Sequence, residues 1–438
     1  MKTRWIAGAL LLCCPAQTER LNHRHSNQNP PTYSKGKGTF PMTETAIGQE
    51  TGTGRKLLPI ETLAQDVSAF ALDLYHQLRW SEGNLFLSPY GISAALAMAH
   101  AGARGNTETQ MARALRYTLR QESLHPAFAE LGSGLAKLQE GGHIKLSTAN
   151  SVWPQQGYPL LDGYLSLIKR HYGVSVTPLH YSDAPEAARE TINRWVDKRT
   201  DHKIKNLIQP GVLGVLTRLV IVNAIYFGGE WACKFQASLT KNEPFLISPE
   251  MSVQVSLMKQ EGEFRYGESE SIQVLELPYL SKTLSMLILL PREKDGLKHL
   301  EHSLSVENLA RWRNALREEQ VEVFLPRFRM TCTFRLDKAL SAMGMADAFI
   351  ESKADFSGMD GRPGWLYLGA VLHKTYVDVN EEGTEAAAAT LAMAKPTAAP
   401  GQPPVFRADH PFLFAICETR SGTLLFLGRL TDPTKTGT

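Results

Sequence analysis

Cysteine is scarce in this chain, and a long apolar run is missing. Five cysteines occur among 438 residues, and Cys13 and Cys14 lie close to the N-terminus. The others, Cys233, Cys332 and Cys417, are widely spaced and odd in number, so we expect buried thiols without a disulfide framework or metal-ligand spacing. No stretch reaches the roughly 18 apolar residues that a transmembrane helix needs, which argues against membrane insertion.

Strong net charge and the common catalytic motifs are also absent. A net charge of +3 is too small to imply a nucleic-acid partner. The chain has no Gly-X-Ser-X-Gly, His-Glu-X-X-His, phosphate-loop or dinucleotide-binding glycine pattern, so we expect no enzyme; a hydrolase built from scattered residues is the alternative. His299 and His302 flank Glu301 without a further ligand nearby, so we expect neither a metal nor a cofactor.

The N-terminus has the pattern of a secretory signal. Two basic residues precede the apolar run Trp5–Cys14, and Ala16 offers a small residue near a cleavage point. We expect residues 1–16 to be removed and the protein to be secreted or extracellular, or periplasmic if the source is a bacterium. The absence of an Asn-X-Ser/Thr sequence favours a bacterial source. A frayed apolar terminus and a lipid anchor at Cys13 or Cys14 are the alternatives.

Residues 17–58 predict a disordered linker, because they have few large apolar side chains to offset the entropy of ordering. Helical spacing of apolar residues begins after it and predicts a helix over Glu61–Leu78. Ser88 and Pro89 have the residue types of an N-cap and a first turn. A further helix is expected over Ala187–Lys198.

The most apolar segments predict buried strands. Leu219–Phe227 is continuous and β-branched, which is typical of a central strand. Leu284–Leu290 and Leu424–Leu427 have the same character. Helices dominate the first half and strands the second, so we predict a single α+β domain.

An unusual segment follows the strand pattern Val371–Val379. It combines an acidic pair, one glycine and then small residues: Glu381, Glu382, Gly383, Thr384, Glu385, Ala386, Ala387, Ala388, Ala389 and Thr390. This hinge segment could enter a sheet because it lacks bulk. Alanine has the best helix propensity, so a surface helix over Thr384–Ala394 is the alternative.

Together with several ordered motifs, the hinge segment resembles that of the serpin family. The motifs are Asn84–Ser93, Val222–Phe227 with Gly229 and Trp231, Leu325–Phe328, and Phe406–Phe414. The resemblance implies one domain over 59–433 with three β-sheets, about eight to nine helices, an exposed reactive-centre loop at about 381–405 and a tail at 434–438. Gly91 and Gly228 stand where the family usually has Ser and Lys, and we expect altered local packing with unchanged activity.

The resemblance also implies an irreversible inhibitor of serine endopeptidases. A protease cleaves the loop and forms an acyl-enzyme, and the freed strand inserts into the central sheet before deacylation. Since a strand has period two, Thr384, Ala386, Ala388 and Thr390 would enter the core. All four are small. A non-inhibitory serpin acting as a carrier, a chaperone or a storage protein is the alternative.

In inhibitory members the cleaved bond lies fourteen positions beyond the hinge glycine, which gives Thr397–Ala398. Its small uncharged side chains favour an elastase-like or subtilisin-like protease. Met393–Ala394 is the alternative bond, open to chymotrypsin- or elastase-like enzymes. Lys395 would attract a trypsin-like protease, but Pro396 follows it directly.

Six positions carry over from the family as structural parts of the switch. Glu381 would pair with Arg327, and Trp231 would pack beneath that pair. His373 would join Asn223 and Ser88 in a hydrogen-bonded cluster that the inserting strand must part.

Beyond the protease we expect a monomer with no nucleic-acid or membrane partner. Arg113, Arg116 and Arg120 could share one helical side, as a glycosaminoglycan site would need. Glu108 and Glu122 flank them, so a solvated helix face is favoured.

Overall fold

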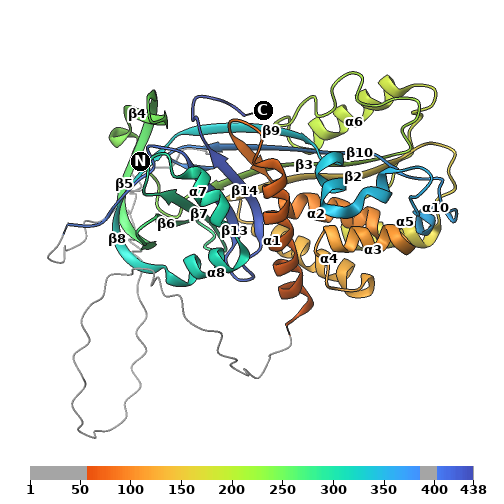
Figure 1. Ribbon diagram of the computed structural model, residues 1–438, viewed down its shortest axis with the longest axis horizontal. Helices are drawn as coiled ribbons and strands as arrows, with labels where there is room; N and C mark the ends of the chain where they lie inside the picture. The colour runs from red at the N-terminus through yellow and green to blue at the C-terminus, as the bar shows by residue number, and fades with distance from the viewer. Residues whose placement is uncertain (1–56, 385–401, 438) are drawn as a thin grey trace, which may run out of the picture. The chain divides into compact units, whose positions relative to one another are not determined.

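The computed structural model describes residues 57–384 and 402–437 (Figure 1). The expected signal peptide, nearly all of the linker, the hinge residues from Glu385 onward and both candidate cleavage sites lie outside these residues. The described α-helices are α1 (Pro59–Leu78), α2 (Pro89–His100), α3 (Gly105–Ala114), α4 (Gln121–Leu138), α5 (Asp162–Tyr172), α6 (Pro185–Arg199), α7 (Leu297–Ser303), α8 (Val306–Ala315), α9 (Asp337–Leu340) and α10 (Ser357–Asp360).

Local sequence signals explain where these helices start. Pro59 occupies the first turn of α1, and the Glu61 carboxylate accepts a hydrogen bond of 2.9 Å from the backbone N–H of Leu58. Ser88 caps α2, because its hydroxyl accepts from the backbone N–H of Gly91 at 3.1 Å. The helix expected over Ala187–Lys198 is α6, two residues longer at its start and one at its end.

The described strands form two hydrogen-bonded sheets. The larger has the order β1-β14-β13-β7-β6-β5-β8-β12, with β4 also paired to β5, and the smaller has the order β2-β3-β11-β10-β9. The strands are β1 (Leu85–Leu87), β2 (Ile144–Pro154), β3 (Leu219–Glu230), β4 (Lys241–Ser248), β5 (Met251–Glu268), β6 (Ile272–Pro278), β7 (Leu284–Pro291), β8 (Arg317–Pro326), β9 (Phe328–Arg335), β10 (Leu368–Val379), β11 (Gly383–Thr384), β12 (Val405–Arg407), β13 (Phe412–Glu418) and β14 (Leu424–Leu430).

The α+β prediction is confirmed, and the counts of elements differ from those expected. Two sheets replace three because β5 is long enough to join two of them: its first part pairs with β4 and β8, and its last four residues pair with β6. The described residues contain ten α-helices, of which α9 and α10 have four residues each. The long helices therefore match the expected eight to nine.

The five-stranded sheet separates two apolar cores. On one face, α6 packs over alternate residues of β3, from Val220 to Tyr226. The opposite face, with Ile221 and Phe227, belongs to the main core beneath α1 to α5. Figure 1 shows α6 on one side of β3 and β10 and helices α2 to α5 on the other. Every residue of β3 except its last is buried, as expected for a central strand.

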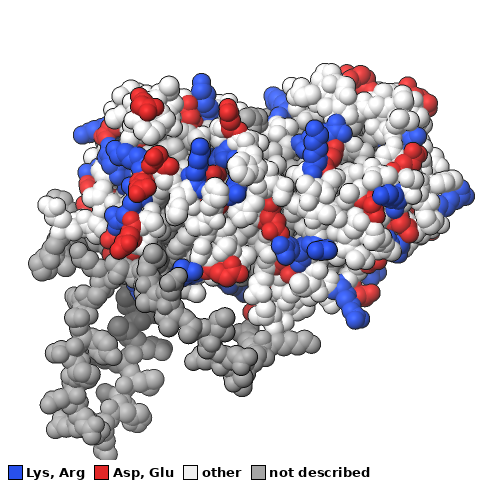
Figure 2. Space-filling model, in the orientation of Figure 1, with Lys and Arg blue, Asp and Glu red and all other residues white. Residues whose placement is uncertain are grey.

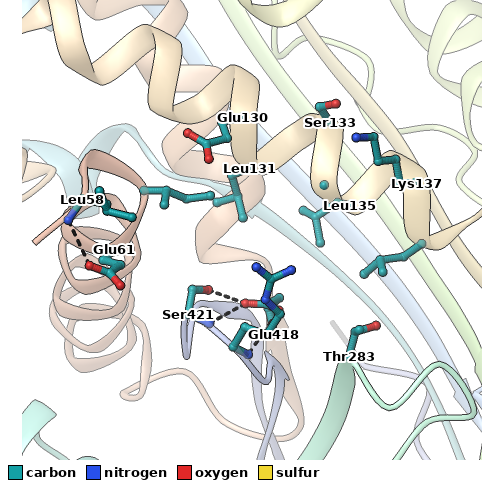
Figure 3. A pocket seen from close by; sticks show the side chains of 14 residues that line it. Leu58, Glu61, Glu130, Leu131, Ser133, Leu135, Lys137, Thr283, Glu418 and Ser421 are labelled. Carbon is teal, nitrogen blue, oxygen red and sulfur yellow. Dashed lines mark hydrogen bonds between the residues drawn. The ribbon is translucent and has the colours of Figure 1, made fainter.

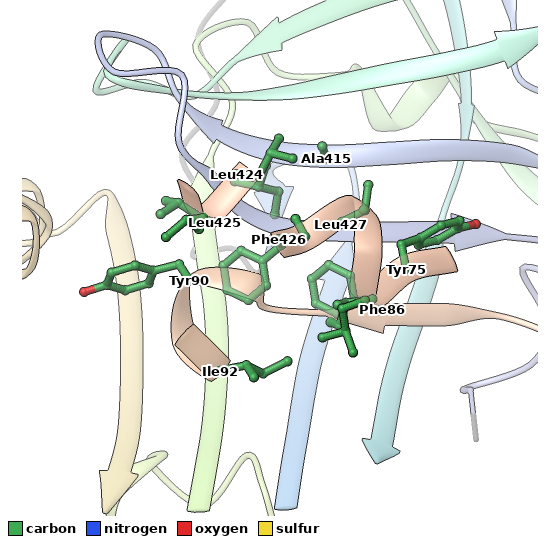
Figure 4. Close-up of a cluster of buried hydrophobic side chains, with 14 of the residues drawn as sticks. Tyr75, Phe86, Tyr90, Ile92, Ala415, Leu424, Leu425, Phe426 and Leu427 are labelled. Carbon is green, nitrogen blue, oxygen red and sulfur yellow. The ribbon is translucent and has the colours of Figure 1, made fainter. Parts of the chain in front are cut away.

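The main core continues into the nine-stranded sheet. Figure 4 shows Phe86 of β1 beside Phe426 of β14, and their rings stack at 5.1 Å. Tyr75 of α1 and Leu427 lie beside them in the same cluster. The buried character expected of Leu284–Leu290 and Leu424–Leu427 is confirmed.

The C-terminal tail contacts the domain, and the three described cysteines form no disulfide bond. Asn84 donates to the carbonyl oxygens of Asp432 (2.7 Å) and Lys435 (2.9 Å), so the expected tail is bonded to the domain. Cys332 and Cys417 are buried, whereas Cys233 is only partly buried. Within residues 57–384 and 402–437, no helix combines the length and the hydrophobicity needed to span a bilayer.

Candidate functional site

The centre of the five-stranded sheet is split at one end by the start of the hinge segment. Strands β3 and β10 run parallel and pair from Leu219 with Leu368 to Tyr226 with Tyr376. Beyond that level β11 lies between them: Gly383 and Thr384 pair antiparallel with β3, and Thr384 also pairs with Val379. The hinge residues Glu381–Thr384 were expected in an exposed loop, but Thr384 is completely buried and Glu381 is 6% exposed.

Gly383 is the residue that allows this entry. Its φ is +156°, which L side chains rarely adopt, and a Cβ atom there would lie 2.0 Å from the carbonyl oxygen of Gly229. The backbone of the hinge therefore touches the backbone of β3 with no room for a side chain.

Thr384 is held inside the sheet by a hydroxyl contact. Its Oγ1 lies 2.9 Å from the hydroxyl of Tyr279, which is also buried. Because an unpaired buried hydroxyl is costly, a residue at this position needs to be small and either polar or well packed. Tyr279 was not among the sequence candidates, since nothing in its local pattern links it to a segment about a hundred residues away.

The acidic pair of the hinge is engaged by basic residues. Arg327 Nε donates to Glu381 at 2.6 and 2.8 Å, and Thr240 donates to the same carboxylate at 2.5 Å. Burial alone would raise the pKa of Glu381, but these hydrogen bonds outweigh it and hold the pKa below its ordinary value. Glu382 accepts from Lys234 at 2.7 Å. The expected ion pair of Glu381 with Arg327 therefore has its carboxylate inside the protein.

Trp231 lies under the turn that carries this pair. Its indole N–H donates to the carbonyl oxygen of Asn380 at 3.0 Å, and its backbone N–H donates to that of Glu382 at 3.0 Å. The ring stacks on Tyr279 with centroids 4.7 Å apart. The start of the hinge is thus fixed by several contacts to one aromatic residue.

The structure brings His373, Asn223 and Ser88 together in the middle of the sheet. The backbone N–H of Ser88 donates to His373 Nε2 at 3.0 Å, so Nδ1 carries the proton and donates to Asn223 Oδ1 at 2.6 Å. The Ser88 hydroxyl donates to the carbonyl oxygen of Leu425 at 2.7 Å. Complete burial lowers the pKa of His373 to about 3, so the ring is neutral.

Other sequence candidates are occupied by structural contacts. The Glu301 carboxylate, between His299 and His302, accepts from Tyr75 (2.5 Å) and Arg429 (2.9 Å). Arg116 Nε lies 2.5 Å from a carboxylate oxygen of Asp73. On the face shown in Figure 2, basic and acidic side chains are mixed. No group of three potential metal-ligating side chains occurs in the part of the chain that the structure describes.

A cavity of about 630 Å³ lies apart from the hinge, between the start of α1, α4 and the turn joining β13 to β14. Figure 3 shows Leu131 and Leu135 of α4 facing Glu418 and Ser421 across it. The Glu418 carboxylate already accepts hydrogen bonds from Ser421. None of the site residues proposed from the sequence lines this cavity.

Comparisons with known proteins show the family to which this chain is similar. Residues 65–433 match the family described as "Serpin (serine protease inhibitor)". The chain is 40% identical over 385 residues to the human protein named leukocyte elastase inhibitor, covering 85% of this chain and all of that one. It is 38% identical over 425 residues to an uncharacterized serpin-like protein of Thermococcus kodakarensis, covering 96% of this chain and 95% of that one.

Solved structures show the same fold. Uncleaved ovalbumin superposes with a TM-score of 0.77 at 32% identity, covering 85% of this chain and all of that chain. Maspin superposes with a TM-score of 0.78 at 28% identity, covering 86% and 100%. With the family match over most of its length and these relatives, the chain belongs to the serpin family.

Proposed function

We propose that this serpin is an irreversible inhibitor of serine endopeptidases that acts by insertion of its hinge segment between β3 and β10. The observation that carries the proposal is that Gly383 and Thr384 already lie between these strands, antiparallel to β3. A strand that has started in this register can continue between β3 and β10 once their pairs below it separate. A non-inhibitory carrier, chaperone or storage protein is the alternative.

The register gives each later residue a partner on β3. Continuing from Thr384 opposite Gly229, Ala386 would come opposite Phe227, Ala388 opposite Ile225 and Thr390 opposite Asn223. These β3 residues face the main core. Continued in this register, the strand would direct into the core the same small side chains that the sequence predicts to enter it.

Insertion has a defined obstacle. It must separate the eight residue pairs that join β3 to β10, including the pair of Asn223 with His373. Each broken pair would be replaced by hydrogen bonds to the new strand on both sides. The product would have an additional, fully paired central strand, which is why the cleaved form should be the more stable one.

The same register supports the proposed cleavage site. Thr397 would come opposite Leu216, just beyond the first residue of β3, so cleavage after Thr397 frees enough chain to fill the whole slot. Attack of the protease on the carbonyl carbon of Thr397 would leave an acyl-enzyme and release the amino group of Ala398. The small residue Thr397 favours elastase-like or subtilisin-like targets, in keeping with the name of the leukocyte elastase inhibitors that this chain resembles.

A direct experiment is to mix the purified protein with pancreatic elastase and with subtilisin and to run a denaturing gel. We expect a covalent complex that survives boiling, and a released C-terminal fragment that begins at Ala398 by mass spectrometry. A fragment beginning at Ala394 would place the bond at Met393. If every serine protease tested cleaves the protein without forming a covalent complex, the non-inhibitory alternative is supported.

We also propose export of the chain after removal of residues 1–16, from the basic and apolar pattern of the N-terminus. N-terminal sequencing of the protein from its native source should then begin at Gln17. An intact Met1 would rule out this processing.

A further inference from the structure

After β14 the chain continues as a strap, residues 431–437, that is bonded to one buried side chain. Asn84 donates to the carbonyl oxygens of Asp432 and Lys435 at 2.7 and 2.9 Å. Its Oδ1 accepts from the backbone N–H groups of Thr431 and Asp432 at 2.8 and 3.0 Å. Asn84 lies directly before β1, which pairs with β14, so these hydrogen bonds fix the strap to the nine-stranded sheet.

The end of the strap lies against the outer edge of β9. The backbone N–H of Thr331 donates to the carbonyl oxygen of Thr436 at 2.5 Å. Gly437 follows with a φ of +94°, and a Cβ atom there would be 2.9 Å from both Cys332 Sγ and the carbonyl oxygen of Thr331. Figure 1 shows the C-terminus beside β9. Because β9 stands at one end of the five-stranded sheet, the strap covers part of its open edge.

The strap meets β9 at the level where the sheet has to open. Thr331 is opposite Tyr376 of β10, and Tyr376 is opposite Tyr226 of β3. That pair is the first between β3 and β10 below the hinge. In an antiparallel ladder two opposed residues direct their N–H groups either toward each other or away from each other. Because the N–H of Thr331 points to the strap, the N–H of Tyr376 points to β3.

The same short segment that holds the strap also holds β10. The Thr375 hydroxyl of β10 donates to the carbonyl oxygen of Phe86 at 2.7 Å. The backbone N–H of Ser88 donates to His373 Nε2 of β10 at 3.0 Å. Residues 84–88 therefore bind β10 directly, and through Asn84 and the strap they bind β9.

We propose that Asn84 and the strap are positioning elements for insertion, which hold β9 and β10 in place so that the sheet opens by movement of β3. The inference rests on the proposed inhibitory function and deepens it, because it names the half of the sheet that stays fixed. Without the strap, the edge of β9 is open and the β9–β10 half is held only through β10. This half then separates more easily from β3, and the sheet opens without cleavage.

The proposal predicts that loss of the strap affects the intact form more than the cleaved form. A chain that ends after Pro433 lacks the contacts of Lys435 and Thr436. In the intact form, hydrogen exchange of the Tyr376 amide should become at least about fivefold faster, the size expected from one lost hydrogen bond. In the cleaved form the inserted strand fills the slot, so this exchange should stay slow. A purely structural strap would lower the Tm of both forms equally and leave Tyr376 exchange unchanged.

Two variants test the strap without shortening the chain. Asn84→Ala removes the side chain that holds it, and Gly437→Ala places a methyl group against Cys332 and Thr331. Each should accelerate Tyr376 exchange in the intact form. Each should also shorten, at least about threefold, the time for which the protein keeps its inhibition of elastase a few degrees below its Tm. Lys435→Ala is the matched control, because it keeps the backbone carbonyl oxygen that Asn84 contacts.

The outcomes separate the strap from the proposed function. An unmodified protein that forms no covalent complex with elastase overturns the function, and Tyr376 exchange alone then decides on the strap. An unmodified protein that inhibits, with the truncated protein and Gly437→Ala both exchanging Tyr376 at its rate, overturns the positioning role alone. Should the truncated protein or Asn84→Ala fail to fold, Gly437→Ala still decides, since it changes only the end of the strap.

Discussion

Replacement of Thr384 by arginine tests the first step of insertion. Thr384 is completely buried between β3 and β10, with its hydroxyl 2.9 Å from that of Tyr279. An arginine at this position must either leave the sheet or bury a guanidinium group without a partner. If the arginine leaves the sheet, this residue has to be seated together with its charge before insertion can continue, and that cost adds to the insertion barrier.

The size of the effect can be estimated from these contacts. Loss of the Thr384–Tyr279 hydrogen bond costs about 1 kcal/mol. Burial of an uncompensated charge costs several kcal/mol more. If about 3 kcal/mol of this appears in the insertion barrier, insertion slows by more than about a hundredfold. Deacylation takes place in the protease and is unaffected, so hydrolysis should overtake insertion.

The assay is titration of elastase followed by a denaturing gel. Thr384→Arg should give cleaved protein and free, active protease, with little covalent complex. Thr384→Val is the matched control: it keeps the volume, loses one hydrogen bond and should still form the complex. A Thr384→Arg protein that traps elastase at the parental stoichiometry would refute insertion at this position as the inhibitory step.

Three further predictions follow from the same geometry. Gly383→Ala should displace the start of the hinge from between β3 and β10, because its methyl group would meet a carbonyl oxygen of β3 at 2.0 Å. Unchanged protection of the Thr384 amide in hydrogen exchange would contradict this. Burial lowers the pKa of three histidines, to about 4, 3 and 3; they are His100, His125 and His373. Because the unfolded chain binds protons below about pH 6.5 and the folded chain does not, their stabilisation is complete above that pH. It is lost as the pH falls toward 4, by up to about 1.4 kcal/mol per pH unit for each histidine. The Tm should therefore drop steeply between pH 6.5 and 5, and a flat profile would show that these rings stay accessible to protons. Thr397→Arg should redirect inhibition toward trypsin-like proteases, and unchanged selectivity in rate measurements would mean that another bond is cleaved.

Local patterns predicted most of the fold correctly. The helix at Ser88–Pro89 was recognisable because a capping hydroxyl and a first-turn proline act within a few residues. Leu219–Phe227 was recognisable as a central strand because a continuous apolar and β-branched run is typical of a strand buried on both faces. The merging of sheets through β5 was not predictable, since it depends on how far one strand continues past its first partners.

The site was predictable only where the resemblance named its residues. Arg327 and Glu381 were expected to meet, and they do, but the pattern gave no indication that the carboxylate is buried. Thr240 and Lys234 were missed, because both reach the hinge from loops distant in sequence and have no periodic signal. Contacts of this kind come from the tertiary fold and cannot be recognised in any short stretch of the sequence.

The two departures from the family pattern have a common physical explanation in β3. A Cβ atom at Gly91 would lie 2.7 Å from Asn223 Nδ2, and one at Gly228 would lie 2.7 Å from Tyr226 Oη. Each glycine therefore makes room for a polar side chain of β3, one on each face of the sheet. At each position the volume that a side chain would occupy is taken by a polar side chain of β3. Ser at position 91 or Lys at position 228 would meet Asn223 or Tyr226 at this distance unless that side chain moves, so each glycine and its β3 partner have to be considered as a pair.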